Sequence, residues 1–231
     1  MISSKYININ RILAVATFLI SFIVYFDTMA PSVSYWDCGE FIAVSYTLGV
    51  PHPPGSPLFL LLGRIASMIP ISEDIAFRVN ILSPLVSAFA VLFLYLIIVQ
   101  LVNQWRGKIE STTDALISFG AGVVGALTFA FTDSHWFNAV EAEVYAFSTF
   151  FTAIVVWLAL LWNEKADEKG NERYILIISY MIGLATGLHL LNLLTIPFVA
   201  LLIYFRKFKF EWTSFGILVA LTGLVFFIIH N

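Results

Sequence analysis

Two carboxylates, Asp37 and Glu40, lie three residues apart in the segment SYWDCGEF at residues 34–41. A spacing of three places two side chains on one face of a helix, and a positioned carboxylate can accept a proton as a general base. The segment GVPHPPGSPL at residues 49–58 follows soon after and surrounds His52 with four prolines. Proline restricts the backbone and lowers the entropy cost of holding one loop shape. This combination suits a preorganised site.

The acidic pair also has a structural interpretation. Ser34 can cap a helix whose third residue is Asp37, which leaves Glu40 as a solvated acid. Against this, Trp36 and Phe41 make the surroundings apolar. Ionisable groups at membrane depth cost roughly 2.5–3.5 kcal/mol each and usually mark function. Both interpretations stay open from the residues alone.

A second group of polar residues lies further along the chain. Glu141 and Glu143 belong to DSHWFNAVEAEVYAF at residues 133–147, where an apolar run begins. They are either site residues or acids that favour a helix N-terminus. His189, in GLHLLN at residues 187–192, is either a site residue or a structural histidine near a helix end.

The composition indicates which elements must position these residues. The chain has 231 residues, of which 60% are hydrophobic and 12% charged, with a mean hydropathy of +0.90. Soluble domains are about 25% charged, so this composition is typical of a polytopic membrane protein. The net charge of -3 gives no indication of a nucleic-acid partner. The single cysteine, Cys38, excludes an internal disulfide.

A membrane span takes about 20 apolar residues, and the sequence predicts an all-α protein with about seven spans. A short segment at 57–69, which contains Arg64, is expected to lie at the membrane interface. The fifth and sixth runs should be separated by a hairpin near residues 187–192, and Pro84 should kink the second. We interpret residues 1–231 as a single transmembrane domain, the N-terminal part of a longer protein, with a first outer loop at 29–75. The predicted spans are 11–28, 76–102, 114–132, 144–162, 174–189, 191–205 and 213–229.

Positive charge follows the predicted topology. With alternating spans, ten of the 12 basic residues fall on one side, which the positive-inside rule assigns to the cytoplasm. Arg64 and Arg78 are the exceptions. They are expected either to pair with Glu40 or Asp74, or to bind an anionic phosphate. The ten are Lys5, Arg11, Arg106, Lys108, Lys165, Lys169, Arg173, Arg206, Lys207 and Lys209.

The chain resembles the GT-C class of membrane glycosyltransferases. More narrowly, APSVSYWDCGEFIAVSYTLGVPHPPGSPLFLLLGRI at residues 30–65 is similar to the signature of the family of transmembrane protein 260, a protein O-mannosyltransferase, and its bacterial relatives of unknown function. NAVEAEVYAF and GLATGLHLLNLLTIP resemble later motifs of that family. The resemblance covers most of the chain, and the first segment is the most specific.

The resemblance implies a GT-C-like fold with short interfacial helices in the first outer loop. It also implies transfer of a sugar, mannose being one candidate, from a polyprenyl-phosphate carrier to an acceptor hydroxyl of a protein or glycan on the non-cytoplasmic face. Asp37 or Glu40 would be the catalytic base, and a nearby cation would stabilise the leaving phosphate. The residues expected to bind substrate are His52, Arg64, Arg78, Glu141, Glu143 and His189.

Membrane lipids and the lipid-linked sugar are the expected partners, in a bacterial inner membrane with a cytoplasmic N-terminus. No cofactor or metal ligand is assigned, because the clustered acids and histidines have no diagnostic spacing. Whether the site binds a divalent ion stays open. The alternatives are a multi-span transporter, since acids and histidines also mark transport paths, and a non-catalytic membrane scaffold. The lack of an inverted repeat and the clustering of charge in outer loops favour the enzyme.

Overall fold

The computed structural model describes residues 2–230, without the side chains of 229 and 230. Regular structure in this range is helical, apart from an isolated bridge between Ile2 and Ile109. The elements are α1 (Ser4–Asp27), α2 (Cys38–Thr47), α3 (Pro57–Met68), α4 (Ile75–Asn80), α5 (Leu82–Arg106), α6 (Thr112–Ala130), α7 (Asp133–Ala139), α8 (Val144–Lys165), α9 (Glu172–Thr186), the 3-10 helix η1 (Leu190–Leu194), α10 (Thr195–Lys207) and α11 (Trp212–His230).

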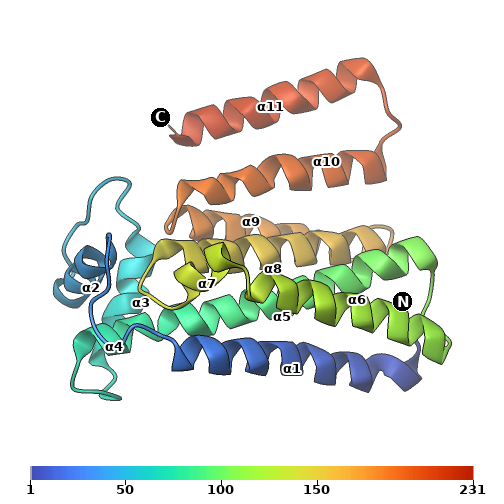
Figure 1. Ribbon diagram of the computed structural model, residues 1–231. Helices are drawn as coiled ribbons and strands as arrows, with labels where there is room; N and C mark the ends of the chain where they lie inside the picture. Colours follow the sequence, from blue (N-terminus) through green and yellow to red (C-terminus); the bar gives the residue numbers. More distant parts are fainter. Residues whose placement is uncertain (1, 231) are drawn as a thin grey trace.

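The predicted all-α membrane architecture is confirmed, and the seven predicted runs correspond to the seven long helices of the bundle (Figure 1). Among the described residues, five helical stretches are long and apolar enough to cross a membrane. The count of seven spans is therefore not confirmed. Helix α9 has 15 residues, about 22 Å at 1.5 Å per residue, which is short of a hydrocarbon core of about 30 Å. The five stretches are Ser4–Asp27, Ile75–Arg106, Thr112–Ala130, Val144–Lys165 and Leu190–Lys207.

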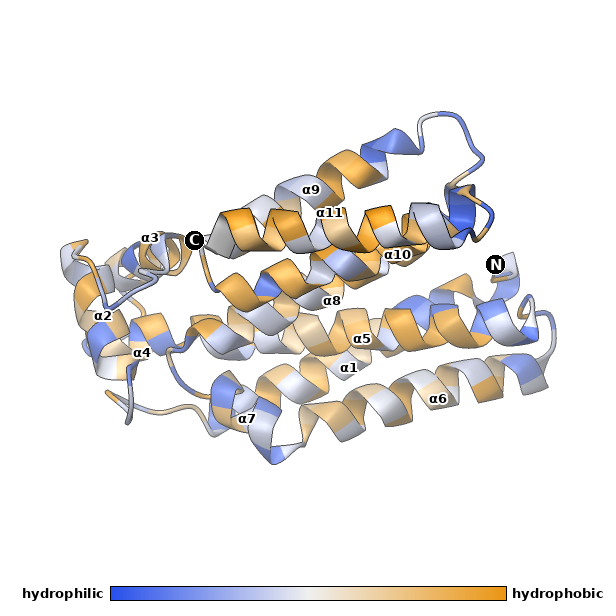
Figure 2. Ribbon diagram, turned by 90° about the horizontal axis from the view of Figure 1, so that it is seen from above, coloured by the Kyte–Doolittle hydropathy of each residue, from blue (hydrophilic) through white to orange (hydrophobic). Residues whose placement is uncertain are grey.

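The connections gather at two ends of the bundle. The start of α1 and the α5–α6, α8–α9 and α10–α11 connections lie at one end, whereas α2, α3 and α4 lie at the other (Figure 1). Hydrophilic residues concentrate toward these ends, and apolar residues cover much of the helices between them (Figure 2). The ten basic residues named above therefore share an end. The assignment of that end to the cytoplasm stays a prediction.

A cluster of aromatic side chains anchors the first outer loop on the bundle. Phe59 of α3 packs between Phe41 of α2 and Phe147 of α8, with ring centroids 5.2 and 5.5 Å away. All three rings are buried, and aromatic pairs at this distance add to the stabilisation from burial. Helices α2 and α3 approach closely at Gly63, where a Cβ would lie 2.8 Å from the Cβ of Ser45. The loop is thus a packed layer at the end of the bundle.

Several local expectations can be compared with the structure. The two short helices of the first outer loop are present as α2 and α3, and Pro57 takes the first position of α3, where its missing N–H costs little. The predicted cap at Ser34 is wrong. Trp36 has a φ of 58°, a left-handed conformation that a helix cannot include, so α2 begins only at Cys38.

The break expected near residues 187–192 is present, whereas the kink expected at Pro84 stays a prediction. Helix α9 ends at Thr186, and η1 separates it from α10, which matches the predicted break at residues 187–192. Only Ile81 lies between α4 and α5. Pro84 is in the first turn of α5, a position that tolerates proline because its N–H has no intrahelical partner.

Candidate functional site

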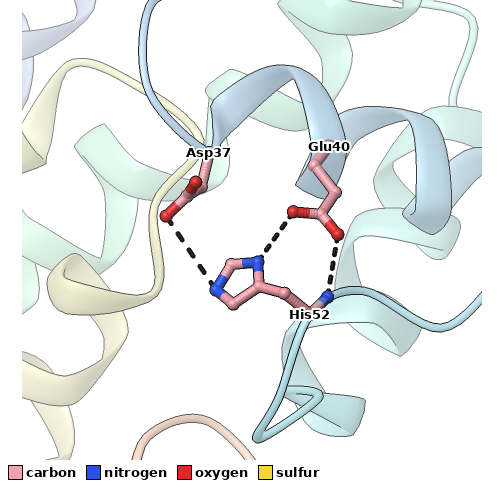
Figure 3. A group of neighbouring side chains, drawn as sticks. All are labelled: Asp37, Glu40 and His52. Atoms are coloured by element: carbon pink, nitrogen blue, oxygen red, sulfur yellow. Dashed lines mark hydrogen bonds and ion pairs between the residues drawn. The ribbon is translucent and has the colours of Figure 1, made fainter.

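His52 joins the two carboxylates of the acidic pair. Its Nδ1 lies 2.7 Å from Glu40 Oε2, and its backbone N–H donates to Glu40 Oε1 at 2.8 Å. Its Nε2 lies 3.9 Å from Asp37 Oδ2 on the other side of the ring. Figure 3 shows the imidazole between the two acids. Asp37 precedes α2 and Glu40 lies in its first turn, so one short helix and one proline-rich loop assemble the group.

The contact between Glu40 and His52 shifts the pKa of both residues. Hydrogen bonds from the ring and the backbone of His52 lower the pKa of the Glu40 carboxyl. The hydrogen bond to Glu40 in turn raises the pKa of His52, and the charges of Glu40, Asp37 and Glu143 add to this effect. The Glu40 carboxylate is therefore already engaged by the hydrogen bonds from His52. Among the described residues, the Asp37 carboxylate has the longer 3.9 Å contact with the ring and no other ion pair, and it is the freer carboxylate.

Glu141 and Glu143 form a buried layer behind this group. Their exposed fractions are 3% and 5%. Ser34 donates a short hydrogen bond to Glu141 Oε2, and the Cys38 thiol lies 3.6 Å from Glu143 Oε1. The connection between α7 and α8 thus packs against the start of α2. Both predicted acids therefore reach the site. In each of these two contacts the partners are about a hundred positions apart in the sequence.

Burial shifts the pKa values of ionisable groups in this layer. Loss of solvent, followed by the negative charge of Asp37, raises the pKa of Glu143 to about 7. Burial and the charges of Glu141 and Glu143 also raise the pKa of the Cys38 thiol, which keeps it protonated and unreactive. A carboxyl that titrates near neutral pH beside a second carboxylate is typical of functional sites.

His189 borders the same region from the break between α9 and η1. Its ring packs on Tyr145, near the start of α8, with centroids 5.2 Å apart. Its Nδ1 accepts from the backbone N–H of Leu191 at 3.1 Å, and burial lowers its pKa. The neighbouring Leu188 carbonyl accepts from the Ser56 hydroxyl at 2.7 Å. Ser56 therefore fixes the proline-rich loop to this break instead of capping α3 with its side chain.

The two outer arginines are held by backbone carbonyl groups. Arg64 donates to the Tyr46 carbonyl and lies over the Tyr46 ring. Arg78 donates to the carbonyls of Ser72 and Ser67, at 2.6 and 2.9 Å. None of the ion pairs within residues 2–230 involves either arginine, so the expected pairing with Glu40 or Asp74 is not seen. Their expected role toward a phosphate stays a prediction.

The three exposed residues of Figure 3 can also hold a cation. One potential ligand atom from each of Asp37, Glu40 and His52 lies within 4.8 Å of the other two. Carboxylate and imidazole ligands together suit Mn²⁺ or Zn²⁺. In such a site His52 would bind through Nε2, because Glu40 already engages Nδ1 and would orient the ring. Binding of a divalent ion stays a prediction.

Two contributors were missed in the sequence. The sequence suggests a cap as one interpretation of Ser34 and excludes a disulfide for Cys38, but in the structure the two residues contact Glu141 and Glu143. Only their place within the same short segment as Asp37 and Glu40 could have indicated them, because the contacts join distant parts of the chain.

Comparison with known proteins gives a consistent result. Residues 37–212 match the family model described as the protein O-mannosyl-transferase TMEM260 N-terminal domain. The chain is 31% identical over 228 residues to protein O-mannosyl-transferase tmem260 of Dictyostelium discoideum, covering 92% of this chain and 25% of that protein. It is 27% identical over 209 residues to the Mus musculus TMEM260 protein, covering 90% and 28%. It thus spans about a quarter of the length of these relatives. No solved structure matches the chain significantly.

Proposed function

Since this chain belongs to the family of the protein O-mannosyl-transferase TMEM260 N-terminal domain, we propose that it is the acid-bearing part of a membrane glycosyltransferase. The enzyme transfers mannose from a polyprenyl-phosphate carrier to a Ser or Thr hydroxyl of a protein. The observation that carries this proposal is the arrangement of Asp37, Glu40 and His52 on a packed layer at one end of an apolar bundle. A polyprenyl-phosphate donor would hold its sugar at the membrane surface, where this end of the bundle is proposed to lie.

Asp37 is the general base in this proposal. The acceptor hydroxyl gives its proton to the Asp37 carboxylate while its oxygen bonds to the anomeric carbon. The bond from that carbon to the phosphate oxygen breaks, and the polyprenyl phosphate leaves with the electron pair. Asp37 suits the role better than Glu40, because Glu40 accepts two hydrogen bonds of 2.7 and 2.8 Å from His52. Glu40 and His52 instead keep the proline-rich loop against α2.

The buried layer behind Asp37 supports the site. Cys38 and Ser34 lie on either side of Asp37 in sequence and contact Glu143 and Glu141, so the backbone around the base is fixed from the α8 side. Rigid support of this kind keeps a catalytic group in its productive geometry. The phosphate of the donor needs a cation as charge develops on it, and Arg64 and Arg78 are the candidates on this end of the molecule.

The site is proposed to face away from the cytoplasm. The opposite end of the bundle carries the ten basic residues, which favour the cytoplasmic side of a membrane. A bacterial inner membrane is the proposed location, with the acceptor protein reaching the outer face. Membrane lipids surround the apolar helices in this arrangement.

A reconstituted transfer assay tests the proposal. The full-length protein in lipid vesicles is given radiolabelled polyprenyl-phosphate mannose and a Ser/Thr-rich peptide, and the mannosylated peptide is quantified. We expect transfer from the lipid donor and none from GDP-mannose. Transfer from GDP-mannose alone would overturn the donor while leaving mannosyl transfer intact. No transfer of any sugar, with lipid donor remaining intact, would overturn the enzymatic proposal.

A further inference from the structure

Asn80 binds the backbone of the segment that leads to Asp37. This segment, residues 28–37, connects α1 to α2 and contains no helix or strand. Asn80 is the last residue of α4, and its side chain is fully buried. Its Nδ2 donates to the carbonyl of Ala30 and to that of Ser32, both at 2.9 Å. One side chain therefore satisfies two backbone acceptors of the segment.

An asparagine side chain suits this position because its amide nitrogen presents two N–H donors without a charge. Within residues 2–230, the Oδ1 acceptor of Asn80 has no hydrogen-bond partner, and an unpaired buried acceptor costs free energy. A leucine of similar size would remove this oxygen but would leave the Ala30 and Ser32 carbonyls without their donor. The two hydrogen bonds to the segment are thus what the buried amide provides.

The element that carries Asn80 is itself firmly held. Arg78 of the same helix donates to two backbone carbonyls of the preceding segment. Val79 is fully buried and packs in the cluster that includes Phe59. Only Ile81 separates α4 from α5, which is one of the long helices of the bundle. Groups on rigid elements can hold a site more precisely than groups on loops.

The position of the Asp37 carboxylate depends on this backbone. Asp37 makes no side-chain hydrogen bond to the start of α2, and its contact with His52 is 3.9 Å long. The backbone before it is fixed by Asn80 and by the connection between α7 and α8, where the Ala30 N–H donates to the Val140 carbonyl at 2.8 Å. Ser32, the second acceptor of Asn80, lies five residues before Asp37.

We propose that Asn80 is a positioning residue for sugar transfer, which acts on the Asp37 carboxylate through the backbone of residues 28–37. This inference rests on the proposed function of Asp37 as the general base. Asn80 does not touch the reacting atoms in this account. A general base must lie within hydrogen-bond distance of the hydroxyl that it deprotonates, and a misplacement of about 1 Å can lower the rate by about 10²-fold.

A double-mutant cycle in the reconstituted transfer assay tests this inference. In the otherwise unchanged full-length protein, Asn80→Leu should lower kcat by about 10²-fold. In the Asp37→Asn background, the same substitution should lower the residual kcat by less than about twofold, because residues that act as a unit are strongly non-additive. A merely structural role would lower kcat by the same factor in both backgrounds.

A second variant and a matched control accompany the cycle, and melting is measured for each protein. Asn80→Asp keeps the size of the side chain and is used in the same cycle if Asn80→Leu does not fold. Asn103→Leu makes the same change at a buried asparagine near the other end of α5, and its effect on kcat should be the same in both backgrounds. Amide hydrogen exchange in residues 28–37 should be faster in the Asn80 variants and unchanged in Asn103→Leu.

Three results would overturn the positioning role of Asn80 while the parent protein remains active. They are equal losses of kcat in the two backgrounds, unchanged hydrogen exchange in residues 28–37, and loss of folding in both Asn80 variants, which would make the residue part of the fold alone. A parent protein that transfers no sugar would instead overturn the proposed function and this inference with it.

Discussion

Glu40 holds His52 by accepting two hydrogen bonds, one from the imidazole Nδ1–H at 2.7 Å and one from the backbone N–H at 2.8 Å. The two residues are 12 positions apart, so this pair closes the proline-rich loop onto the first turn of α2. Both groups are exposed. The loop is therefore held by a pH-sensitive contact at the surface of the proposed active site.

The Glu40–His52 contact should be strongest in mildly acidic solution. His52 has a raised pKa, so its contribution is complete below its ordinary value of 6.5 and is lost as the pH rises through the folded value. Glu40 has a lowered pKa, so its contribution is complete above 4.5 and is lost as the pH falls through the folded value. Both contributions are complete between these two values. In Glu40→Gln, the His52 pKa measured by NMR should fall toward 6.5, and an unchanged value would contradict the pairing.

Glu143→Gln should stabilise the protein in alkaline solution. Folding raises the Glu143 pKa from 4.5 to about 7, so the folded state holds the proton more tightly and stability falls as the pH rises through this interval. A shift of this size corresponds to roughly 3 kcal/mol. Thermal melting at pH 5 and pH 8 should show the variant gaining stability over the parent only at pH 8. The exposed Glu73→Gln is the control, and a pH-independent difference for Glu143→Gln would contradict the burial argument.

Cysteine labelling should place the two ends of the bundle on opposite sides of the membrane. Lys169→Cys lies among the basic connections and Ser134→Cys lies in α7, and both positions are exposed. A membrane-impermeant maleimide added to intact cells should label Ser134→Cys alone, with Lys169→Cys reacting only after lysis. The native Cys38 is fully buried and should give no background. Labelling of both positions from one side would contradict the alternating topology.

The two outer arginines should respond differently to substitution by lysine. Arg78 donates to the carbonyl of Ser67 in α3 and to that of Ser72 in the α3–α4 connection, a geometry that a single ammonium cannot reproduce. Arg78→Lys should therefore lower the melting temperature as well as weaken donor binding. Arg64 has one carbonyl contact, to Tyr46, and Arg64→Lys should weaken donor binding with little effect on melting. Unchanged binding of polyprenyl-phosphate mannose in both variants would assign the phosphate to another group.

The sequence predicted the local features better than the distant contacts. Apolar runs located the long helices, and the short segment predicted at 57–69 corresponds to α3. The cap at Ser34 was mispredicted because no pattern indicated the left-handed Trp36. The contact between Cys38 and Glu143 joins residues 105 positions apart, and such contacts depend on how α8 packs against the outer loop. The count of seven spans stays unconfirmed because α9, with 15 residues, is shorter than the roughly 20 residues that a span takes.

Sugar transfer by Asp37→Asn tests the central claim most directly. The full-length variant is assayed with polyprenyl-phosphate mannose and a Ser/Thr peptide beside Glu40→Gln and the control Glu73→Gln, with melting measured for each. Loss of a general base should lower the rate of transfer by about 10²–10⁴ in Asp37→Asn without unfolding the protein, and Glu40→Gln should cause a smaller loss through the His52 loop. Near-normal transfer in both Asp37→Asn and Glu40→Gln would show that the acidic pair is structural and would contradict the proposed active site.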